Sequence, residues 1–428
     1  MTSFPMDNDS FIVAASWLLS PEAPPLAGGA LLVRRGRIGD LGTLQRLRRD
    51  HPVPIIDHPG CAILPGFINA HTHLELTHFP SWRLRSQLEE HPQRFVDWII
   101  QLIKVKRGLT PDDMRASARE GIRMCLESGT TAVGEIVTAR TLAPLYRGSR
   151  LSGRLFFELV GHDNSRFREL LREAVELSGE SPAGSFSAGL SPHAPYTLGE
   201  ETFPLIREAA AGASLPLAIH CSESTEETNF VFSSSGQLAE RFYPFVGWER
   251  YLPPPRRCST SQLLERAGLL TDSTLAIHCV QVSRADAEIL RKRGVSVALC
   301  PRSNERLDVG RAPVALLRKL GIPLALGTDS LASNDSLSLW DELRFALDAF
   351  GDELSPADLF RMVTLGGATA LGIQGDHGSL EKGKRADFQI VGQAGKRESG
   401  LVERVMLRGV VEDVYVAGER FDGERTSP

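Results

Sequence analysis

The sequence lacks the features that mark several large classes of protein. Its six cysteines include no Cys-x-x-Cys pair, and several lie inside apolar, strand-like runs. We therefore expect buried, reduced thiols and no disulfide framework. No run approaches the roughly eighteen consecutive apolar side chains that a membrane-spanning helix needs, and the first twenty residues lack the basic region of a signal peptide. These absences predict a cytoplasmic protein with no membrane partner.

Positive charge is not in excess either. The formal net charge is −5 and the isoelectric point lies near 6.2, so nothing attracts the chain to nucleic acid. No internal repeat, low-complexity tract or GxGxxG fingerprint is present. The 428 residues, 42% of them hydrophobic and 24% charged, suit a large globular domain with a smaller companion. We expect a small-molecule partner and keep a homodimer as an open alternative.

What the sequence does contain is one unit repeated between Gly66 and about Gly372: a short apolar run, a polar loop and an amphipathic helix. Eight runs turn polar at their C-terminal ends: 62–76, 130–137, 154–161, 185–197, 216–224, 273–282, 295–304 and 323–334. Helices are predicted at 111–129, 199–213, 283–294 and 312–321. Continuous apolar strands that alternate with helices predict a parallel sheet buried on both faces. Eight such strands predict an α/β fold, a (β/α)₈ TIM barrel over residues 65–375.

The flanking regions show a different pattern, with short alternating strands around turn glycines. Residues 1–64 and 376–428 therefore predict one small β-sandwich built from both termini. Two aromatic-rich segments, 78–98 and 231–262, are predicted to be long irregular loops over the active site, because loops of this length are usually functional. Their candidate walls for a binding site are aromatic: Trp82, Phe95, Trp98, Phe245 and Trp248.

Polar residues collect at the C-terminal ends of the predicted strands, where barrels carry their active sites. His71 and His73 are two residues apart, so both side chains face the same side of the first strand. A His-x-His pair alone is weak, but further candidates end other strands: His193, His220, His278 and Asp329. Imidazole and carboxylate ligands suit Zn²⁺, with Fe²⁺ as a second choice. Glu223 lies three residues after His220, where a carboxylate can move protons beside a metal.

These segments resemble the amidohydrolase superfamily and, within it, the group of cytosine, adenosine-derivative and guanine deaminases. The similar stretches include PGFINAHTHLEL, SPHAPYT, HCSES, LCPRSNERL and LGTDSLASNDSLSLWDEL, and they span nearly the whole chain in order. The resemblance implies one divalent metal per chain, bound by four ligands: His71, His73, His220 and Asp329. It also implies that Glu223 shuttles protons, that His278 and Asp329 orient the attacking water, and that His193 contacts the substrate. The second and third strands offer Glu135 and Glu158 but no lysine, which favours a single metal over a lysine-bridged pair.

Within this group the sequence is most similar to aminodeoxyfutalosine deaminases of menaquinone biosynthesis. The implied reaction is hydrolytic deamination of an adenine nucleoside derivative, with release of ammonia. Alternatives are deaminases of methylthioadenosine, S-adenosylhomocysteine, adenosine or guanine, triazine-type chlorohydrolases and cyclic-amide hydrolases. A non-catalytic protein with a relic barrel is a further alternative, but it would have lost a metal-binding residue, and here all four metal-binding residues and Glu223 are present. Substrate contacts are expected from four residues: His193, Arg302, Asn304 and Trp82. Aminodeoxyfutalosine carries a tail carboxylate, for which the candidate cations are Arg83, Arg85, Arg302 and Arg306.

Overall fold

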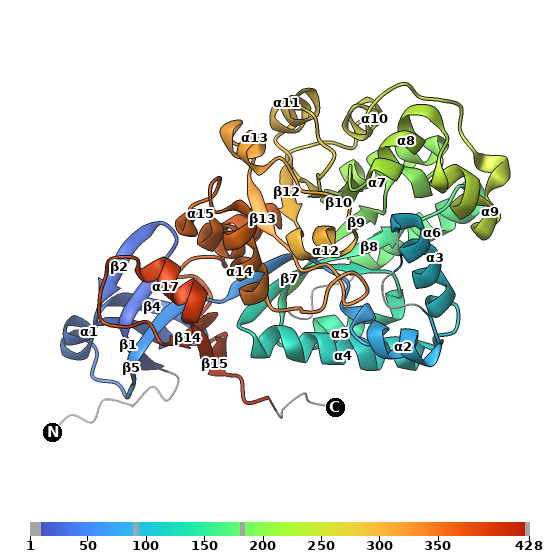
Figure 1. Cartoon of the computed structure of the whole chain (residues 1–428). Helices are drawn as coiled ribbons and strands as arrows, with labels where there is room; N and C mark the ends of the chain where they lie inside the picture. Colours follow the sequence, from blue (N-terminus) through green and yellow to red (C-terminus); the bar gives the residue numbers. More distant parts are fainter. Residues whose placement is uncertain (1–9, 89–91, 93, 180–184, 424–428) are drawn as a thin grey trace.

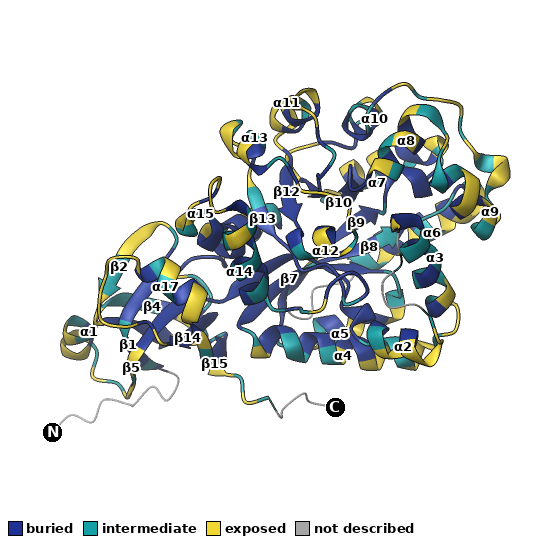
Figure 2. Cartoon of the chain, viewed as in Figure 1, coloured by how far each residue is buried: buried dark blue, intermediate teal, exposed yellow. Residues whose placement is uncertain are grey.

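The computed structural model describes residues 10–88, 92, 94–179 and 185–423. The described residues form two eight-stranded sheets: a parallel sheet in the centre of the chain and a mixed sheet built from its two ends (Figure 1). Helices surround the parallel sheet, with their exposed sides turned outward and the strands buried between them (Figure 2). The predicted α/β architecture, a TIM-like barrel with a module from both termini, is confirmed.

The barrel strands follow one another in sequence order, each parallel to the next. They are β6 (Phe67–Thr72), β7 (Thr130–Val137), β8 (Ser152–Leu159), β9 (Phe186–Pro192), β10 (Leu217–Cys221), β11 (Thr274–His278), β12 (Ser296–Leu299) and β13 (Leu324–Leu326). Every residue of β7 is buried, as expected for a strand covered on both faces. A parallel bridge between Thr72 and Asp329 brings the first and last strands together. The amide of Asp329 also donates to the carbonyl of His71 at 3.1 Å, so the sheet is nearly closed.

Helices occupy the four positions where the sequence predicts them: α4 (Pro111–Glu127), α7 (Phe203–Ala213), α11 (Arg284–Arg293) and α13 (Val314–Lys319). Their ends follow from local chemistry. Thr110 begins α4 with a capping box to Asp113, and α11 ends at Gly294, whose φ of 73° suits a residue without a side chain. The other barrel helices are α5 (Ala143–Arg147), α6 (Asn164–Gly179), α10 (Thr260–Ala267), α12 (Pro301–Arg306), α14 (Leu339–Phe350), α15 (Pro356–Arg361) and α16 (Gly367–Ala370).

The terminal module is one continuous mixed sheet, flanked by α1 (Leu44–Asp50) and α17 (Leu401–Arg408). Its strands are β1 (Ser10–Ser20), β2 (Ala23–Ala27), β3 (Gly29–Arg34), β4 (Arg37–Thr43), β5 (Ile55–Pro65), β14 (Phe388–Gly392), β15 (Val410–Val416) and β16 (Glu419–Arg420). The C-terminal part joins through antiparallel pairing of β14 with β5. Not every pair is antiparallel as expected: β1 and β5 are parallel, because the β3–β4 hairpin and α1 return the chain in its original direction.

The two segments predicted as irregular loops are largely helical, so that prediction is wrong. The first contains α2 (Phe79–Arg85) and the start of α3 (Phe95–Lys106), with residues 89–91 and 93 outside the described part. The second contains the end of α8 (Thr225–Ser233), a π-helical turn (Leu238–Phe242), α9 (Tyr243–Val246) and the start of α10. Each of α2 and α9 has a proline in its first turn. Proline breaks a helix when it lies in the interior, but it is tolerated at the start. The apolar residues Phe95, Ile99 and Ile103 are four residues apart, a spacing that would have predicted the helix α3.

All six cysteines are unpaired and buried, which confirms the expected buried thiols. Among the described residues, no helix combines the length and the hydrophobicity needed to cross a membrane. The largest apolar cluster joins barrel side chains to Trp17, Ala62 and Val391 of the terminal module, whereas smaller clusters lie within the module and within the barrel. The polar residues that remain buried are therefore the informative ones, and several of them gather at one end of the barrel.

Candidate metal centre and active site

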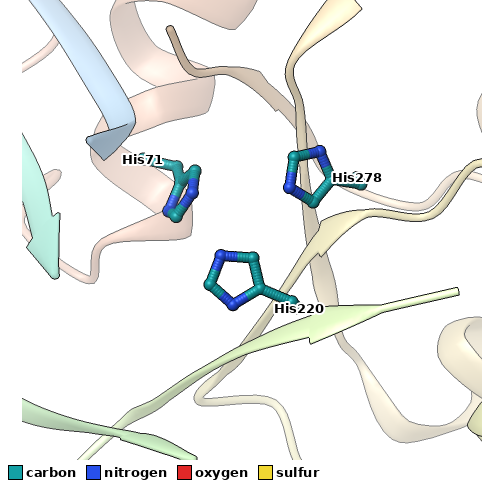
Figure 3. Close-up of side chains that lie close together, drawn as sticks. All are labelled: His71, His220 and His278. Atoms are coloured by element: carbon teal, nitrogen blue, oxygen red, sulfur yellow. The ribbon is translucent and has the colours of Figure 1, made fainter. Parts of the chain in front are cut away.

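Histidines from four strand ends meet at the C-terminal mouth of the barrel. Ring centroids lie 4.9 Å apart for His71 and His73, 5.0 Å for His71 and His220 and 4.8 Å for His193 and His220. The ring of His278 lies 5.6 Å from that of His220. Figure 3 shows His71, His220 and His278 turned toward a common space. The structure thus brings together the side chains that the sequence places at separate strand ends.

Two overlapping groups of these residues could hold a metal ion: His71, His220 and His278, and His71, His73 and Asp329. Within each group the ligand atoms lie within 4.8 Å of one another. Asp329 Oδ1 lies 3.6 Å from His71 Nε2 and 3.7 Å from His73 Nε2. His71 belongs to both groups and therefore lies at the centre of the cluster.

The protein atoms fit a divalent ion. Both ring nitrogens of His71 are buried and have no hydrogen-bond partner among the described residues, and leaving such atoms unpaired costs about 1–3 kcal/mol. His220 Nδ1 donates to the carbonyl of His193 at 2.9 Å, so its Nε2 carries the lone pair that a metal requires. A cation between these rings would supply a partner for one of the two His71 nitrogens, Nε2, which faces Asp329 Oδ1.

Asp329 is held so that one of its oxygens faces the histidines. Its Oδ2 accepts hydrogen bonds from Ser303 Oγ at 2.8 Å and Ser333 Oγ at 2.7 Å, which leaves Oδ1 toward His71 and His73. Burial alone would raise the pKa of Asp329, but the neighbouring histidines outweigh it and hold the pKa well below its usual value. The carboxylate is therefore ionised and oriented, as a metal ligand must be.

Removing both hydroxyls is expected to weaken metal binding. The double variant Ser303→Ala, Ser333→Ala frees the Asp329 carboxylate to rotate, and loss of such supporting contacts typically costs about 10–100-fold in metal affinity. Competition with a chromophoric zinc chelator measures this change. Ser235→Ala, at an exposed serine, is the matched control, and equal zinc affinity in both proteins would contradict the supporting role.

Glu223 is 4% exposed, and its Oε1 lies 3.6 Å from His278 Nε2. Burial, together with the charge of Asp329, raises the pKa of Glu223 well above its usual value. Its position depends on Glu227, which the sequence reasoning missed. The Glu227 carboxylate accepts from the amides of Ser222 at 2.9 Å and Glu223 at 3.0 Å. The signal was the spacing from Ser224, the residue that caps α8 and accepts from the amide of Glu227.

The backbone at these strand ends is unusual. Four residues other than glycine adopt positive φ values: Ser222 (53°), His278 (68°), Cys279 (51°) and Asp329 (58°). This conformation is uncommon for residues with a side chain and is maintained only where the surrounding structure imposes it. The four residues lie at or just after the C-terminal ends of β10, β11 and β13, beside the cluster of histidines.

The four expected substrate contacts have different environments. His193 lines the cavity beside the cluster, and its Nδ1 is 3.0 Å from Thr197 Oγ1. Asn304 is buried, and its Oδ1 lies 2.9 Å from His278 Nδ1, so it orients that histidine. Trp82 packs against Leu76, Phe79, Val105 and Ala332 in an apolar cluster. Arg302 pairs with Asp335 and borders a separate cavity, which Arg306 also lines.

The cavity beside the cluster has a volume of about 430 Å³. Its polar end is formed by His73, His193, His220, Glu223, His278, Asp329 and Ser330, and its apolar wall includes Trp98, Ile99, Leu102, Tyr196, Phe242 and Trp248. Trp98 and Trp248 are thus the two expected wall residues that line it. An outer cavity of about 800 Å³ shares Thr138, Glu158, Val160, Val246 and Trp248 with it. Such volumes are typical of small-molecule sites.

The model of the amidohydrolase family matches residues 62–420, and the chain belongs to that family. This confirms the resemblance and the expectation of a hydrolytic enzyme. Its relatives include the 5-methylthioadenosine/S-adenosylhomocysteine deaminase of Desulforudis audaxviator, with 33% identity over 345 residues, or 78% of this chain and 74% of the relative.

Solved structures show the same fold. An adenosine deaminase from Xanthomonas campestris with bound zinc superposes with a TM-score of 0.77 at 26% identity, covering 96% of this chain and 92% of the other. The aminofutalosine deaminase of Helicobacter pylori in complex with methylthio-coformycin gives a TM-score of 0.82 at 23% identity, covering 96% and 99%. At that second identity the likeness speaks for the fold alone.

Proposed function

We propose that the protein is a mononuclear, zinc-dependent hydrolase that removes the 6-amino group of an adenine nucleoside bearing a substituent beyond its ribose. The observation that carries this proposal is the cavity in which Glu223 and His278 face each other beside the cluster of His71, His73, His220 and Asp329. The names of the zinc-bound adenosine deaminase and of the methylthioadenosine deaminase relative support this substrate class.

The bound ion would supply a Lewis acid that activates water at neutral pH. Glu223 would transfer a proton to the ring nitrogen next to C6, which makes that carbon electrophilic. It would then take a proton from the water that adds at C6 and pass it to the departing amine. His278, oriented by Asn304, would hold the attacking water. Water adds at C6 and ammonia leaves, so the product carries a carbonyl in place of the amino group.

The shape of the cavity favours a substrate longer than adenosine. The larger outer cavity adjoins the inner one and shares Glu158 and Trp248 with it, so a group attached to the ribose could extend in that direction. The first substrates we propose are 5′-methylthioadenosine and S-adenosylhomocysteine.

The second candidate substrate is 6-amino-6-deoxyfutalosine. It is supported by the arginines and aromatic rings of the outer cavity (Arg140, Arg166, Arg250, His162, Trp248 and Tyr251), which could bind a benzoate. The four arginines singled out in the sequence do not line either cavity among the described residues.

An ammonia-release assay tests the proposal. The zinc-loaded protein is given adenosine, 5′-methylthioadenosine, S-adenosylhomocysteine, 6-amino-6-deoxyfutalosine, guanine and a chlorotriazine. We expect kcat/KM for at least one 5′-substituted adenosine to exceed that for adenosine by about 10-fold or more, because the extension buries additional surface. Release of chloride from the triazine, or ammonia from guanine alone, would contradict it.

A further inference from the structure

Two oppositely charged side chains line the inner cavity away from the metal cluster. Glu158 is the penultimate residue of β8 and borders both cavities. Lys106 is the last residue of α3 and borders the inner one. Much of the surrounding wall is apolar, with Leu102, Ile103, Val160 and Trp248 among its residues. Burying a charged group in such a wall costs free energy, so the presence of Glu158 and Lys106 there suggests a role in binding a ligand.

Lys106 is held by a salt bridge within the protein, whereas only one of the two carboxylate oxygens of Glu158 accepts a hydrogen bond from a described residue. Lys106 Nζ lies 3.1 Å from Glu75 Oε1, and Glu75 Oε2 accepts from the amide of Ala139 at 3.1 Å. Glu158 Oε2 accepts from Thr138 Oγ1 at 2.9 Å. No described residue donates a hydrogen bond to Glu158 Oε1, so its lone pairs remain available to a ligand.

Both groups carry their charge. Burial would raise the pKa of Glu158, but His193, Lys106 and His73 together lower it below the usual value. Burial would likewise lower the pKa of Lys106, but Glu75 and Glu158 raise it above the usual value. His73 and His193 act on Glu158 because it lines the same cavity as the metal cluster. If the adenine ring lies at the cluster, the sugar attached to it lies next to Glu158.

We propose that Glu158 and Lys106 form the site that binds the vicinal hydroxyl groups of the substrate's sugar, with Glu158 accepting their hydrogen bonds. This proposal rests on the proposed function, because a nucleoside whose base reaches the metal cluster places its sugar next along the cavity. A carboxylate with a free oxygen suits a pair of O–H donors. The ammonium of Lys106, held by Glu75, donates to a hydroxyl oxygen. The pair therefore selects ribonucleosides over deoxynucleosides.

The test compares substrates that lack one hydroxyl. For the unmodified protein, 2′-deoxyadenosine and 3′-deoxyadenosine should show kcat/KM values about 10–100-fold below that of adenosine, the usual size of a lost hydrogen bond to a charged group. The loss should appear mainly in KM, because the hydroxyls are bound equally before and during the reaction. In Glu158→Gln the penalty should shrink to less than about 5-fold. An unchanged penalty in the variant would overturn the proposal.

Binding measurements separate this proposal from the proposed function. Calorimetry of Glu223→Gln, whose turnover should be about 10²–10⁴-fold slower, reports the same discrimination between adenosine and the two deoxyadenosines from binding alone. Glu176→Gln, at a surface carboxylate paired with Arg172, is the matched control and should discriminate like the unmodified protein. Binding with the expected discrimination but no ammonia release would overturn the proposed function alone. Deamination without any dependence on the hydroxyls would overturn the sugar site alone, and a protein that binds no nucleoside would overturn both.

Discussion

Replacing Glu223 by glutamine is expected to lower kcat by about 10²–10⁴-fold, the usual scale for the loss of general acid–base catalysis, while the metal stays bound. The amide has the shape of the carboxyl group but cannot deliver a proton to the substrate and recover it. Glu223 lies 3.6 Å from His278 and within the cavity lining, so its loss acts on the reaction itself. Steady-state kinetics with parallel elemental analysis measures both quantities.

The fold should survive this substitution, because the contacts that hold the turn are made by the backbone of residue 223 and the side chain of Glu227. Glu226→Gln changes a carboxylate on the first turn of α8 and serves as the control, with kcat expected near that of the unmodified protein. Near-normal turnover by Glu223→Gln would show that the carboxylate is only a structural element of the loop.

The strands and their terminal polar residues could be predicted because that information is local. An apolar run fixes where a strand lies, and the alternation of side chains places His71 and His73 on the same side of it. All eight predicted barrel strands are present. Since parallel strands end at one rim, residues as distant as His71 and Asp329 could be expected to meet without knowledge of the packing between them.

The substrate side of the site could not be predicted in the same way. Arg302, Ser303 and Asn304 are consecutive, yet the helix α12 turns them in different directions. Arg302 points to a surface cavity and pairs with Asp335, whereas Ser303 and Asn304 point inward to Asp329 and His278. Nearness to a strand end in sequence does not decide which residue faces the substrate. Lys106 was not identified as a candidate because the sequence analysis predicted no helix at residues 95–106, and Lys106 is the last residue of α3.

The second large effect is expected from His71. In His71→Ala the protein should lose its tightly bound metal and with it essentially all activity, because this side chain belongs to both possible ligand groups. Its ring nitrogens have no other hydrogen-bond partner among the described residues, so no protein contact competes with metal binding. Elemental analysis after dialysis against a chelator, followed by zinc addition, measures the effect.

Chelation of the unmodified protein should abolish activity, and zinc should restore it at about one ion per chain, whereas His71→Ala should recover nothing. The matched control is His78→Ala, because His78 lies just beyond the first strand and contacts Trp82 outside the cluster. That variant should keep its metal.

The same experiment tests the number of ions per chain. No lysine that could bridge two metals lies at the ends of β7 and β8. Glu135, the carboxylate on β7, is already hydrogen-bonded to Thr72 and Tyr146. Two tightly bound ions per chain would therefore contradict the mononuclear site, and full activity in the chelated protein would contradict metal dependence altogether.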